Sequence, residues 1–371
     1  MARVFRNILG SFSDGAILFP LIAAISSGTG VSSAKLFLST SLLYFISGFW
    51  FRVPMAVQPL KAIAIAAIVS GASFLEIRWA GALLGVLCLA CLMLPIEKMK
   101  DRIPKYVIQG IQLSLGLMLM RRGVEILFPV LPNLWTTPNV LLGIGCVVSL
   151  ILGRAVNLSF LGLLAALGVV LGLSHTGEVH ATSLVVDSKI SFERILVLVV
   201  PQLLLTGTNS VISTSDVAQR YFGDQAKRVT IRSLLTSIGL GNCLVALMGG
   251  LPFCHGSGGV TAHVRGGSDH WLSNFVIGFF LLGLSLFQFY GANVSLQYPP
   301  FLLGIMLIIV GGYHALLARP SWKEVPLRPF LISMGVVSVL TNNLLLGLTL
   351  GLALQFGIIR FAVRRSVYDS V

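Results

Sequence analysis

Charged residues are scarce in this chain. Only 11% of its 371 residues are Asp, Glu, Lys or Arg, whereas 56% are hydrophobic. Soluble globular domains carry roughly 25% charged residues. With a mean hydropathy of +0.91, the chain has too few polar side chains to cover the surface of a soluble protein. These values predict an all-α integral membrane protein that crosses the bilayer many times.

Cysteine is also scarce, and no other metal ligand accompanies it. The five cysteines are scattered through apolar runs, and the one close pair, Cys88 and Cys91, has neither a histidine nor a second cysteine pair near it. We interpret both as small packing residues of a helix, and we expect no bound metal and no cofactor.

Acidic residues are half as frequent as basic ones, 13 against 26, so the net charge is +13. Such a charge can indicate a nucleic-acid-binding protein, but here the basic residues lie in short connections between apolar runs. The positive-inside rule produces this distribution in membrane proteins. We therefore expect the lipid bilayer, and no nucleic acid, as a partner.

The apolar runs divide the chain into two sets of seven. The first set is expected at residues 12–27, 36–51, 59–71, 79–95, 105–120, 138–153 and 157–173. The second is expected at 195–214, 231–249, 257–265, 272–290, 298–317, 328–341 and 343–362. The domains would be a first repeat (1–173), a linker (174–193) and a second repeat (194–371). Because each repeat has an odd number of spans, the two are expected to be inverted.

Loop charges predict that both termini are cytoplasmic, in the cell (inner) membrane. In that orientation the cytoplasmic side receives Lys98, Lys100, Arg102, Lys105, Arg154, Arg220, Lys227, Arg228, Arg265, Arg319, Lys323, Arg328, Arg360, Arg364 and Arg365. The outer side receives the linker, which has Glu178, Asp187 and Glu193 against one lysine. Arg121 and Arg122 do not fit this orientation, because a fifth span that ends at residue 120 places both on the outer side.

The third and tenth spans are interrupted by proline at corresponding places. The segments Arg52-Val-Pro-Met-Ala-Val-Gln-Pro-Leu-Lys61 and Leu251-Pro-Phe-Cys-His-Gly-Ser-Gly-Gly259 each precede a span too short to cross a bilayer alone. Pro54 and Pro252 are 198 positions apart, a little over half the chain. Broken segments at matching places of two repeats are the best sequence indicator of a secondary transporter's binding site.

The polar groups of these segments suit an anion. Gln58 and Lys61 stand at the expected N-terminus of the third span, where free N–H groups and the helix dipole attract negative charge. In the second segment His255 and Ser257 offer donors, and glycines let a ligand approach the backbone. These glycines are Gly256, Gly258 and Gly259. The alternative is that Lys61 extends to the membrane interface and that the glycines only allow tight packing.

Two further spans add polar groups. Thr206 and Asn209 lie on one predicted face of the eighth span and are expected to contact the substrate. Asp14, in the first span, is the candidate for coupling transport to protons. It could instead cap a helix or pair with Lys61.

These residues resemble the signature motifs of the MOT1-type molybdate transporters, which are distant relatives of the sulfate permease (SulP) family. Residues 54–66 and 250–263 carry the resemblance, and residues 12–21 and 205–216 add to it. The chain departs from the usual motifs at Ala16, Ala56, Ser257 and His263–Val264.

The resemblance implies a fold and an activity. It implies a seven-plus-seven inverted repeat with two half-helices. In it a core domain (spans 1–4 and 8–11) would move against a gate domain (spans 5–7 and 12–14), in elevator-type alternating access. It implies import of molybdate, a possible homodimer, and no C-terminal STAS domain. An inside-negative potential opposes entry of a dianion, so with Asp14 present we expect proton symport.

Other functions stay open at this point. A sulfate or general oxyanion permease would differ only in cavity size and donor placement. A nucleobase permease is less favoured, because it is expected to present a carboxylate where this chain has Thr206, Asn209 and Ser257. An enzyme would need Cys254 and His255 as nucleophile and base, but adjacent residues in a turn rarely reach each other, and no orienting acid is evident. We expect a transporter and not an enzyme.

Overall fold

The first half of the chain is almost entirely helical. The computed structural model describes residues 2–95, 104–133, 135, 137–151, 157–173, 190–290 and 296–368. Its elements up to residue 173 are α1 (Ala2–Ser11), the 3-10 helix η1 (Phe12–Asp14), α2 (Gly15–Thr29), α3 (Ser33–Phe51), β1 (Gln58–Pro59), α4 (Lys61–Ser70), α5 (Phe74–Cys91), α7 (Lys105–Leu127), η2 (Phe128–Asn133), α8 (Thr137–Ile151) and α9 (Asn157–Leu173).

The second half follows a similar order of elements. They are α10 (Phe192–Leu205), the π-helix η3 (Thr206–Ile212), α11 (Ser213–Phe222), η4 (Gly223–Arg228), α12 (Ile231–Met248), β2 (Phe253–Cys254), α13 (Ser257–Arg265), α14 (Leu272–Tyr290), α15 (Pro300–Leu316), α16 (Arg319–Lys323), η5 (Val325–Leu327), α17 (Arg328–Thr341) and α18 (Leu344–Tyr368). Most of the linker expected at 174–193 lies outside the described residues.

Several helical stretches can cross a bilayer. Among the described residues, six are long and apolar enough: Arg3–Thr29, Ser33–Phe51, Phe74–Cys91, Phe192–Arg228, Ile231–Met248 and Leu272–Tyr290. The chain is therefore an integral, multi-pass membrane protein. Expected spans 157–173, 257–265, 272–290 and 328–341 coincide with helices α9, α13, α14 and α17.

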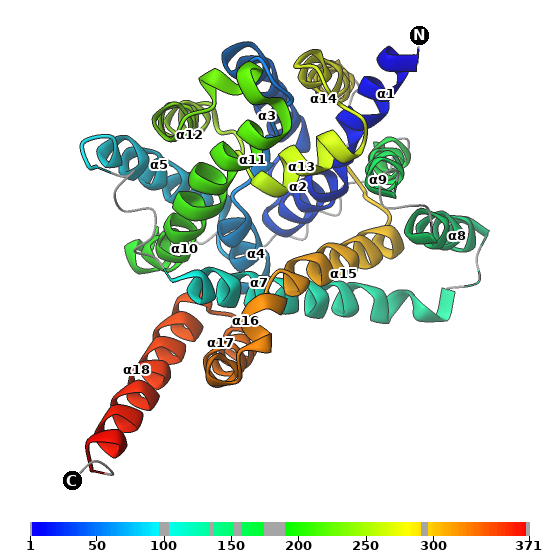
Figure 1. Ribbon diagram of the computed structural model, residues 1–371. Helices are drawn as coiled ribbons and strands as arrows, with labels where there is room; N and C mark the ends of the chain where they lie inside the picture. Colours follow the sequence, from blue (N-terminus) through cyan, green and yellow to red (C-terminus); the bar gives the residue numbers. More distant parts are fainter. Residues whose placement is uncertain are drawn as a thin grey trace.

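The two proline-broken segments pair with each other in the middle of the molecule. β1 and β2 run antiparallel, with Gln58 opposite Cys254 and Pro59 opposite Phe253. β1 leads into α4, which has 10 residues, and β2 is followed by α13, which has 9. At 1.5 Å per residue each helix covers about half of a hydrocarbon layer roughly 30 Å thick. Figure 1 shows α4 and α13 at the centre, surrounded by longer helices.

Helices of the two halves pack in reciprocal pairs. α3 packs on α14, α5 packs on α12, and α7 packs on α15. Glycines allow backbone contact in two of these pairs. In α5 and α12, a Cβ on Gly85 would lie 2.8 Å from the Gly239 carbonyl; in α7 and α15, a Cβ on Gly116 would lie 2.5 Å from the Gly311 carbonyl. Small residues at helix crossings are the usual means of close packing in membranes.

Arg121 and Arg122 belong to a helix rather than to a loop. The expected end of the fifth span at residue 120 is wrong, because α7 continues to Leu127. Both side chains pair with Glu125, at 2.9 and 3.1 Å, and Arg121 Nη1 donates to the Val339 carbonyl of α17 at 2.5 Å. The two arginines therefore carry a packing role that the loop-charge rule does not address.

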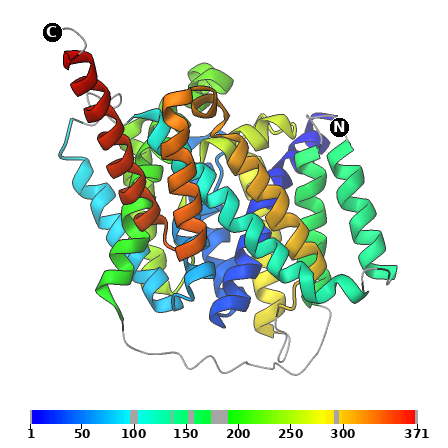
Figure 2. The same cartoon turned by 90° about the horizontal axis from the view of Figure 1, so that it is seen from below.

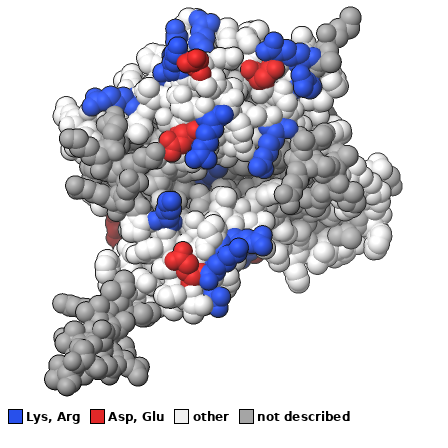
Figure 3. All heavy atoms as spheres, viewed as in Figure 1, with Lys and Arg blue, Asp and Glu red and all other residues white. Residues whose placement is uncertain are grey.

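Basic side chains gather on the face of the molecule turned to the viewer in Figure 1. Figure 3 shows Lys and Arg residues spread across it, around a recess near its middle. α1 begins and α18 ends at this same end of the helices, as Figure 2 shows. Of the loop residues expected on this side, Lys98, Lys100, Arg102 and Arg154 lie outside the described residues, as do the side chains of Arg360, Arg364 and Arg365.

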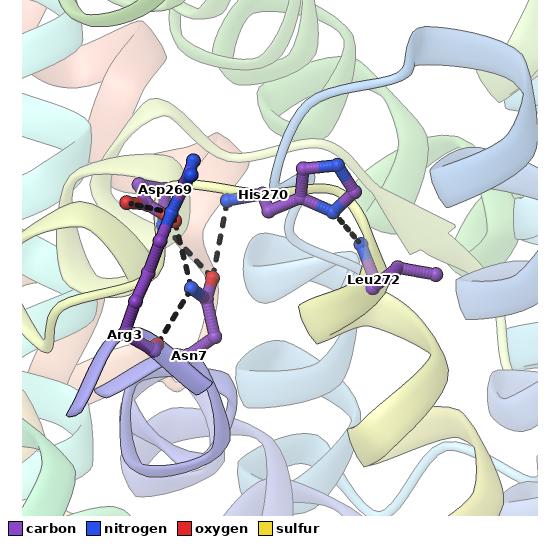
Figure 4. A network of polar contacts seen from close by, with 5 residues as sticks. All are labelled: Arg3, Asn7, Asp269, His270 and Leu272. Carbon is purple, nitrogen blue, oxygen red and sulfur yellow. Dashed lines mark hydrogen bonds and ion pairs between the residues drawn. The ribbon is translucent and has the colours of Figure 1, made fainter. Parts of the chain in front are cut away.

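A polar network ties the first helix to the connection between α13 and α14. Arg3 Nε donates to the Asp269 carboxylate at 3.0 Å, and Asn7 Nδ2 donates to it at 2.7 Å. Asn7 Oδ1 accepts the backbone N–H groups of Asp269 and His270. Figure 4 shows Asn7 at the centre of these contacts, which hold the start of the first span against the end of α13.

Candidate functional site

Lys61 is a buried cation without a bonded partner. It is the first residue of α4, and its exposed fraction is 4%. It forms no hydrogen bond and no ion pair with another described residue; its electrostatic neighbours are the Asp14 carboxyl and the Cys254 thiol. A lone charge at the centre of a bilayer costs about 2.5–3.5 kcal/mol. The expected alternative, in which Lys61 extends to the interface, does not fit this burial.

Polar side-chain atoms of Gln58, Lys61 and Asn209 approach the backbone of Gly256 closely. A Cβ atom on Gly256 would lie 2.8 Å from Gln58 Oε1, 3.6 Å from Lys61 Nζ and 3.7 Å from Asn209 Nδ2. Polar atoms from β1, α4 and η3 thus converge on one point beside the Gly256 backbone. At Gly259, a Cβ would lie 2.7 Å from Gln58 Nε2, so this glycine lets α13 approach β1. The two glycines therefore do more than permit helix packing: one of them borders the point where the polar atoms meet.

The N-terminus of α13 is open. Of the first four N–H groups of this helix, the last two donate to the Gly256 carbonyl, at 3.0 and 3.2 Å. Those of Ser257 and Gly258 have no partner among the described residues. Gly258 is exposed, and no atom lies within 4 Å of a Cβ placed there. The Ser257 hydroxyl donates to Asn209 Oδ1 at 2.7 Å, which leaves the Asn209 amide nitrogen on the side of Gly256. Free N–H groups at a helix N-terminus are a ready anion site.

The N-terminus of α4 is largely capped from another helix. Gln202 Oε1, in α10, accepts the N–H groups of Ala62 and Ile63 at 2.7 and 3.4 Å. Gln202 Nε2 donates to Thr206 Oγ1 at 2.9 Å. Thr206, an expected substrate residue, therefore supports the cap instead of joining the point beside Gly256. The sequence gives no signal for this cap, since its donors lie about 140 residues from Gln202.

The eighth span is not a regular α-helix. Between α10 and α11 it is π-helical over Thr206–Ile212, and π-bulges occur frequently at functional sites. A π-helix holds more residues per turn than an α-helix, so the single polar face expected from α-helical spacing is divided. Thr206 turns to Gln202, and Asn209 turns to Ser257.

Asp14 lies directly behind Gln58. It is fully buried, and its carboxylate accepts hydrogen bonds from Tyr44 Oη at 2.7 Å and from Gln58 Nε2. The Asp14 side chain caps no helix. Among the described residues no ion pair joins it to Lys61, although the two groups interact electrostatically. Its coupling role stays a prediction. Tyr44 was not predicted from the sequence, because it lies on another span than Asp14 and Gln58.

His263 completes the surroundings of Asp14. Its ring is fully buried, with its centroid 6.5 Å from that of Tyr44. Nδ1 lies 3.1 Å from the Gly10 carbonyl, and Nε2 has no hydrogen-bond partner among the residues described. His263 has an electrostatic contact with Asp14. The chain therefore has a buried polar cluster behind the point beside Gly256.

His255, an expected substrate residue, is engaged in structural bonds. Nδ1 lies 2.8 Å from the Ala56 carbonyl, and Nε2 lies 2.9 Å from the Ser237 hydroxyl. Because a carbonyl only accepts, Nδ1 carries the proton and Nε2 accepts from Ser237. The ring also packs edge-on against Phe51 and Phe253. His255 thus fixes the strand segments and has no free polar atom for a ligand.

A cavity of about 230 Å³ lies between α3 and α12. Its lining is mostly apolar and includes Leu43, Trp50, Leu240 and Phe253. Phe253 is its contact with the strand pair, and no charged side chain lines it. This cavity does not suit an anion, so the candidate site is the point beside Gly256.

The expected site residues thus separate into three groups. Those that meet beside Gly256 are Gln58, Lys61, Asn209, Gly256 and Ser257. Those that border them are Gly258, Gly259 and Asp14. Those held in structural bonds are Thr206 and His255. Lys61 Nζ, Asn209 Nδ2 and Gln58 Oε1 approach the point beside Gly256, and the two N–H groups at the start of α13 follow it directly in the chain. The ammonium, amide and N–H donors are suited to an oxyanion.

Comparison with known proteins places these segments in a family. The family described as "Molybdate transporter of MFS superfamily" matches residues 6–119 and 194–313, well over half of the chain and one segment in each half. Molybdate transporter 1 of Arabidopsis thaliana is 27% identical over 377 residues, covering 85% of this chain and 81% of that protein. Molybdate transporter 2 of the same plant is 23% identical, covering 82% and 77%.

Solved structures share the fold. The transmembrane domain of the bicarbonate transporter BicA of a cyanobacterium gives a TM-score of 0.59 at 14% identity, covering 94% of this chain and 97% of that one. The murine Solute Carrier 26 family member A9 anion transporter, in the inward-facing state, gives 0.63 at 13% identity, covering 97% and 69%. At these identities the likeness concerns the fold alone. The protein has a membrane transporter fold.

Proposed function

This chain belongs to the molybdate transporter family, and we propose that it carries molybdate across the membrane as a secondary transporter. The observation that carries the proposal is the buried Lys61 ammonium, which forms no hydrogen bond or ion pair among the described residues and lies on the Gly256 side of the open N-terminus of α13. A dianion bound there would satisfy the cation and the free N–H groups together. The chain is a transporter by family, and no enzymatic step is proposed.

The donor set favours an oxyanion over a nucleobase. Lys61, Asn209 and the N-terminus of α13 all offer hydrogen-bond donors to the point beside Gly256. The nearest carboxylate, Asp14, lies behind Gln58 and is bonded to it and to Tyr44. A sulfate or general oxyanion permease is the second candidate, because all tetrahedral dianions can use the same donors.

We further propose that the chain forms fourteen spans as two inverted repeats, over 1–173 and 194–371. The pairs α3 with α14 and α5 with α12 support this, because in each pair the second span of one half packs on the fourth span of the other half. The core domain would contain α4 and α13, and it would move against a gate that includes α7 and α15. Both termini would be cytoplasmic, in agreement with the basic face of Figure 3. A homodimer is proposed on the resemblance alone.

The test is uptake of radiolabelled molybdate into proteoliposomes that contain the purified protein. We expect uptake above that of empty liposomes, competition by tungstate, and weak competition by sulfate. Equal competition by sulfate would establish a general oxyanion permease instead. Uptake of uracil without any uptake of molybdate would overturn the proposal. An imposed inward proton gradient is expected to increase molybdate uptake, because cotransported protons offset the charge of the dianion.

A further inference from the structure

Gln58 has a buried acceptor atom that points the wrong way for an anion. Its exposed fraction is 0%, and its Oε1 atom has no hydrogen-bond partner in the part of the chain that the structure describes. That oxygen lies 2.8 Å from the position of a Cβ on Gly256, the same point that Lys61 Nζ and Asn209 Nδ2 approach. A carbonyl lone pair directed at this point repels the negatively charged oxygen of a bound oxyanion. The site therefore contains one group that opposes its proposed ligand.

The orientation of the Gln58 amide follows from the state of Asp14. An ionised carboxylate only accepts hydrogen bonds, and Asp14 accepts from both Tyr44 Oη and Gln58 Nε2. With the amide nitrogen committed to Asp14, the amide oxygen necessarily turns to the other side, toward Gly256. The orientation of Gln58 is thus the one expected beside a carboxylate that accepts from Gln58 Nε2.

We propose that Gln58 is the switch that couples a proton to the anion. This inference rests on the proposed function and deepens it. When a proton from solution binds the Asp14 carboxylate, the new O–H group becomes a donor. The Gln58 amide then turns over, so that Oε1 accepts from Asp14 and Nε2 donates to the anion. One proton is taken up, and no other covalent bond is formed or broken. The hydrogen bond from Gln58 Nε2 to Asp14 is replaced by one from Asp14 to Gln58 Oε1, and the site gains a donor in place of a repelling acceptor.

The groups around Asp14 fit a site where a proton and an anion are bound together. The titratable side chains that face it are Tyr44 of α3, Lys61 of α4, Cys254 of β2 and His263 of α13. Of these, Lys61 interacts favourably with the Asp14 carboxyl, and a dianion bound beside Lys61 would compete with Asp14 for that interaction. From α9, the Ser159 hydroxyl contacts the neighbouring Ser13 and adds no charge.

The measurement is the dissociation constant of molybdate as a function of pH, from about pH 6.5 to about pH 8.5. For the wild-type protein we expect binding to strengthen by about tenfold for each unit that the pH falls, while one proton is linked to one anion. Asp14→Asn is expected to bind tightly at every pH, because its new amide group can donate to Gln58 Oε1 and hold Nε2 toward the anion. The same variant should lose proton-driven uptake while retaining molybdate exchange.

Gln58→Leu removes the amide and leaves Asp14 in place. We expect weaker binding at every pH. The slope of log Kd against pH should be less than half of the wild-type slope. The matched control is Gln355→Leu in α18, because Gln355 is also buried with an unpartnered Oε1 atom; it should keep the wild-type slope. If Asp14→Asn does not fold, the slope of Gln58→Leu decides alone.

The outcomes separate this inference from the proposed function. Molybdate binding that does not change with pH in the wild type, or a full wild-type slope in Gln58→Leu or Asp14→Asn, would overturn the switch and leave the molybdate site standing. Failure of the wild type to bind molybdate at any pH would overturn the proposed function and the switch together. A slope that is present in the wild type and Gln355→Leu, but reduced in Gln58→Leu, supports the switch.

Discussion

The N-terminal turns of α4 and α13, which we call their entrances, occupy matching places in the two halves, but their chemistry differs. α4 begins with a cation, and two of its N–H groups are capped by Gln202. α13 begins with Ser257 and glycines, has no cation in its first turn, and leaves two N–H groups open. Two identical entrances would offer two equal anion sites. With one entrance capped and the other open, the chain offers a single anion site. α4 contributes the Lys61 ammonium group to it, and α13 contributes backbone N–H groups.

The largest expected effect comes from removing the charge that α4 contributes. Lys61→Ala should weaken molybdate binding by about 100-fold, since a hydrogen bond to a charged group contributes about 1.5–3 kcal/mol. The protein should remain folded, because Lys61 makes no hydrogen bond to another described residue. Isothermal titration in detergent measures the change. Lys35→Ala, on the exposed start of α3, is the control and should bind as the wild type does. Tight binding by Lys61→Ala would show that the anion is held elsewhere.

A second test compares two glycines of α13 that are two residues apart. In Gly256→Ala the added methyl group enters the space between Gln58, Lys61 and Asn209, so we expect binding to fall by about tenfold or more through lost complementarity. In Gly258→Ala the methyl group meets nothing within 4 Å, and binding should change by less than about twofold. Molybdate titration of both variants gives the ratio. Equal effects would mean that the anion does not occupy the space beside Gly256.

A third test removes the cap from α4. Gln202→Leu leaves the N–H groups of Ala62 and Ile63 without their acceptor, so thermal unfolding in detergent should show a loss of about 1 kcal/mol, the usual cost of a lost N-cap. Thr206→Val keeps the cap and removes only the hydroxyl that accepts from Gln202, so its loss should be smaller. If Thr206→Val were the more destabilising of the two, the cap would not be what stabilises this end of α4.

Sequence patterns predicted the elements of this fold better than their interactions. Hydrophobic length located α9, α13, α14 and α17, because each is bounded by polar or proline-containing connections. It placed the end of α7 too early, since Arg121 and Arg122 were read as loop residues although they pair with Glu125 one turn away. Charge alone does not distinguish a helix end from the inside of a long helix that has local partners.

The same limit applies to the site. Gln58, Lys61 and Gly256 were predicted, because broken segments concentrate polar groups and glycine where a bilayer disfavours them. The bonds of His255 to Ala56 and Ser237 were not predicted, and neither was the contact of Tyr44 with Asp14. These partners come from other spans, and single-sequence patterns contain no information on which spans meet. The π-helix over Thr206–Ile212 likewise changed which side chains of the eighth span face the site.

The smallest expected effect lies far from both entrances, in the network of Figure 4. The hydrogen bond from the Asn7 amide, with the nearby Arg3 guanidinium, lowers the pKa of Asp269 below its ordinary value of 3.8. A carboxyl whose pKa is lower in the folded protein adds stability above its unfolded pKa and loses it as the pH falls through the folded value.

Asp269→Asn should therefore remove a small part of the stability that the protein loses below about pH 4. We expect this part to be less than about 1 kcal/mol, because the Arg3–Asp269 pair is exposed to solvent. Thermal unfolding at about pH 6 and about pH 3 measures it, and Asp224→Asn, at a side chain that is 95% exposed, is the matched control. An equal change in both variants would assign the acid sensitivity to general charge repulsion instead of to this contact between α1 and the end of α13.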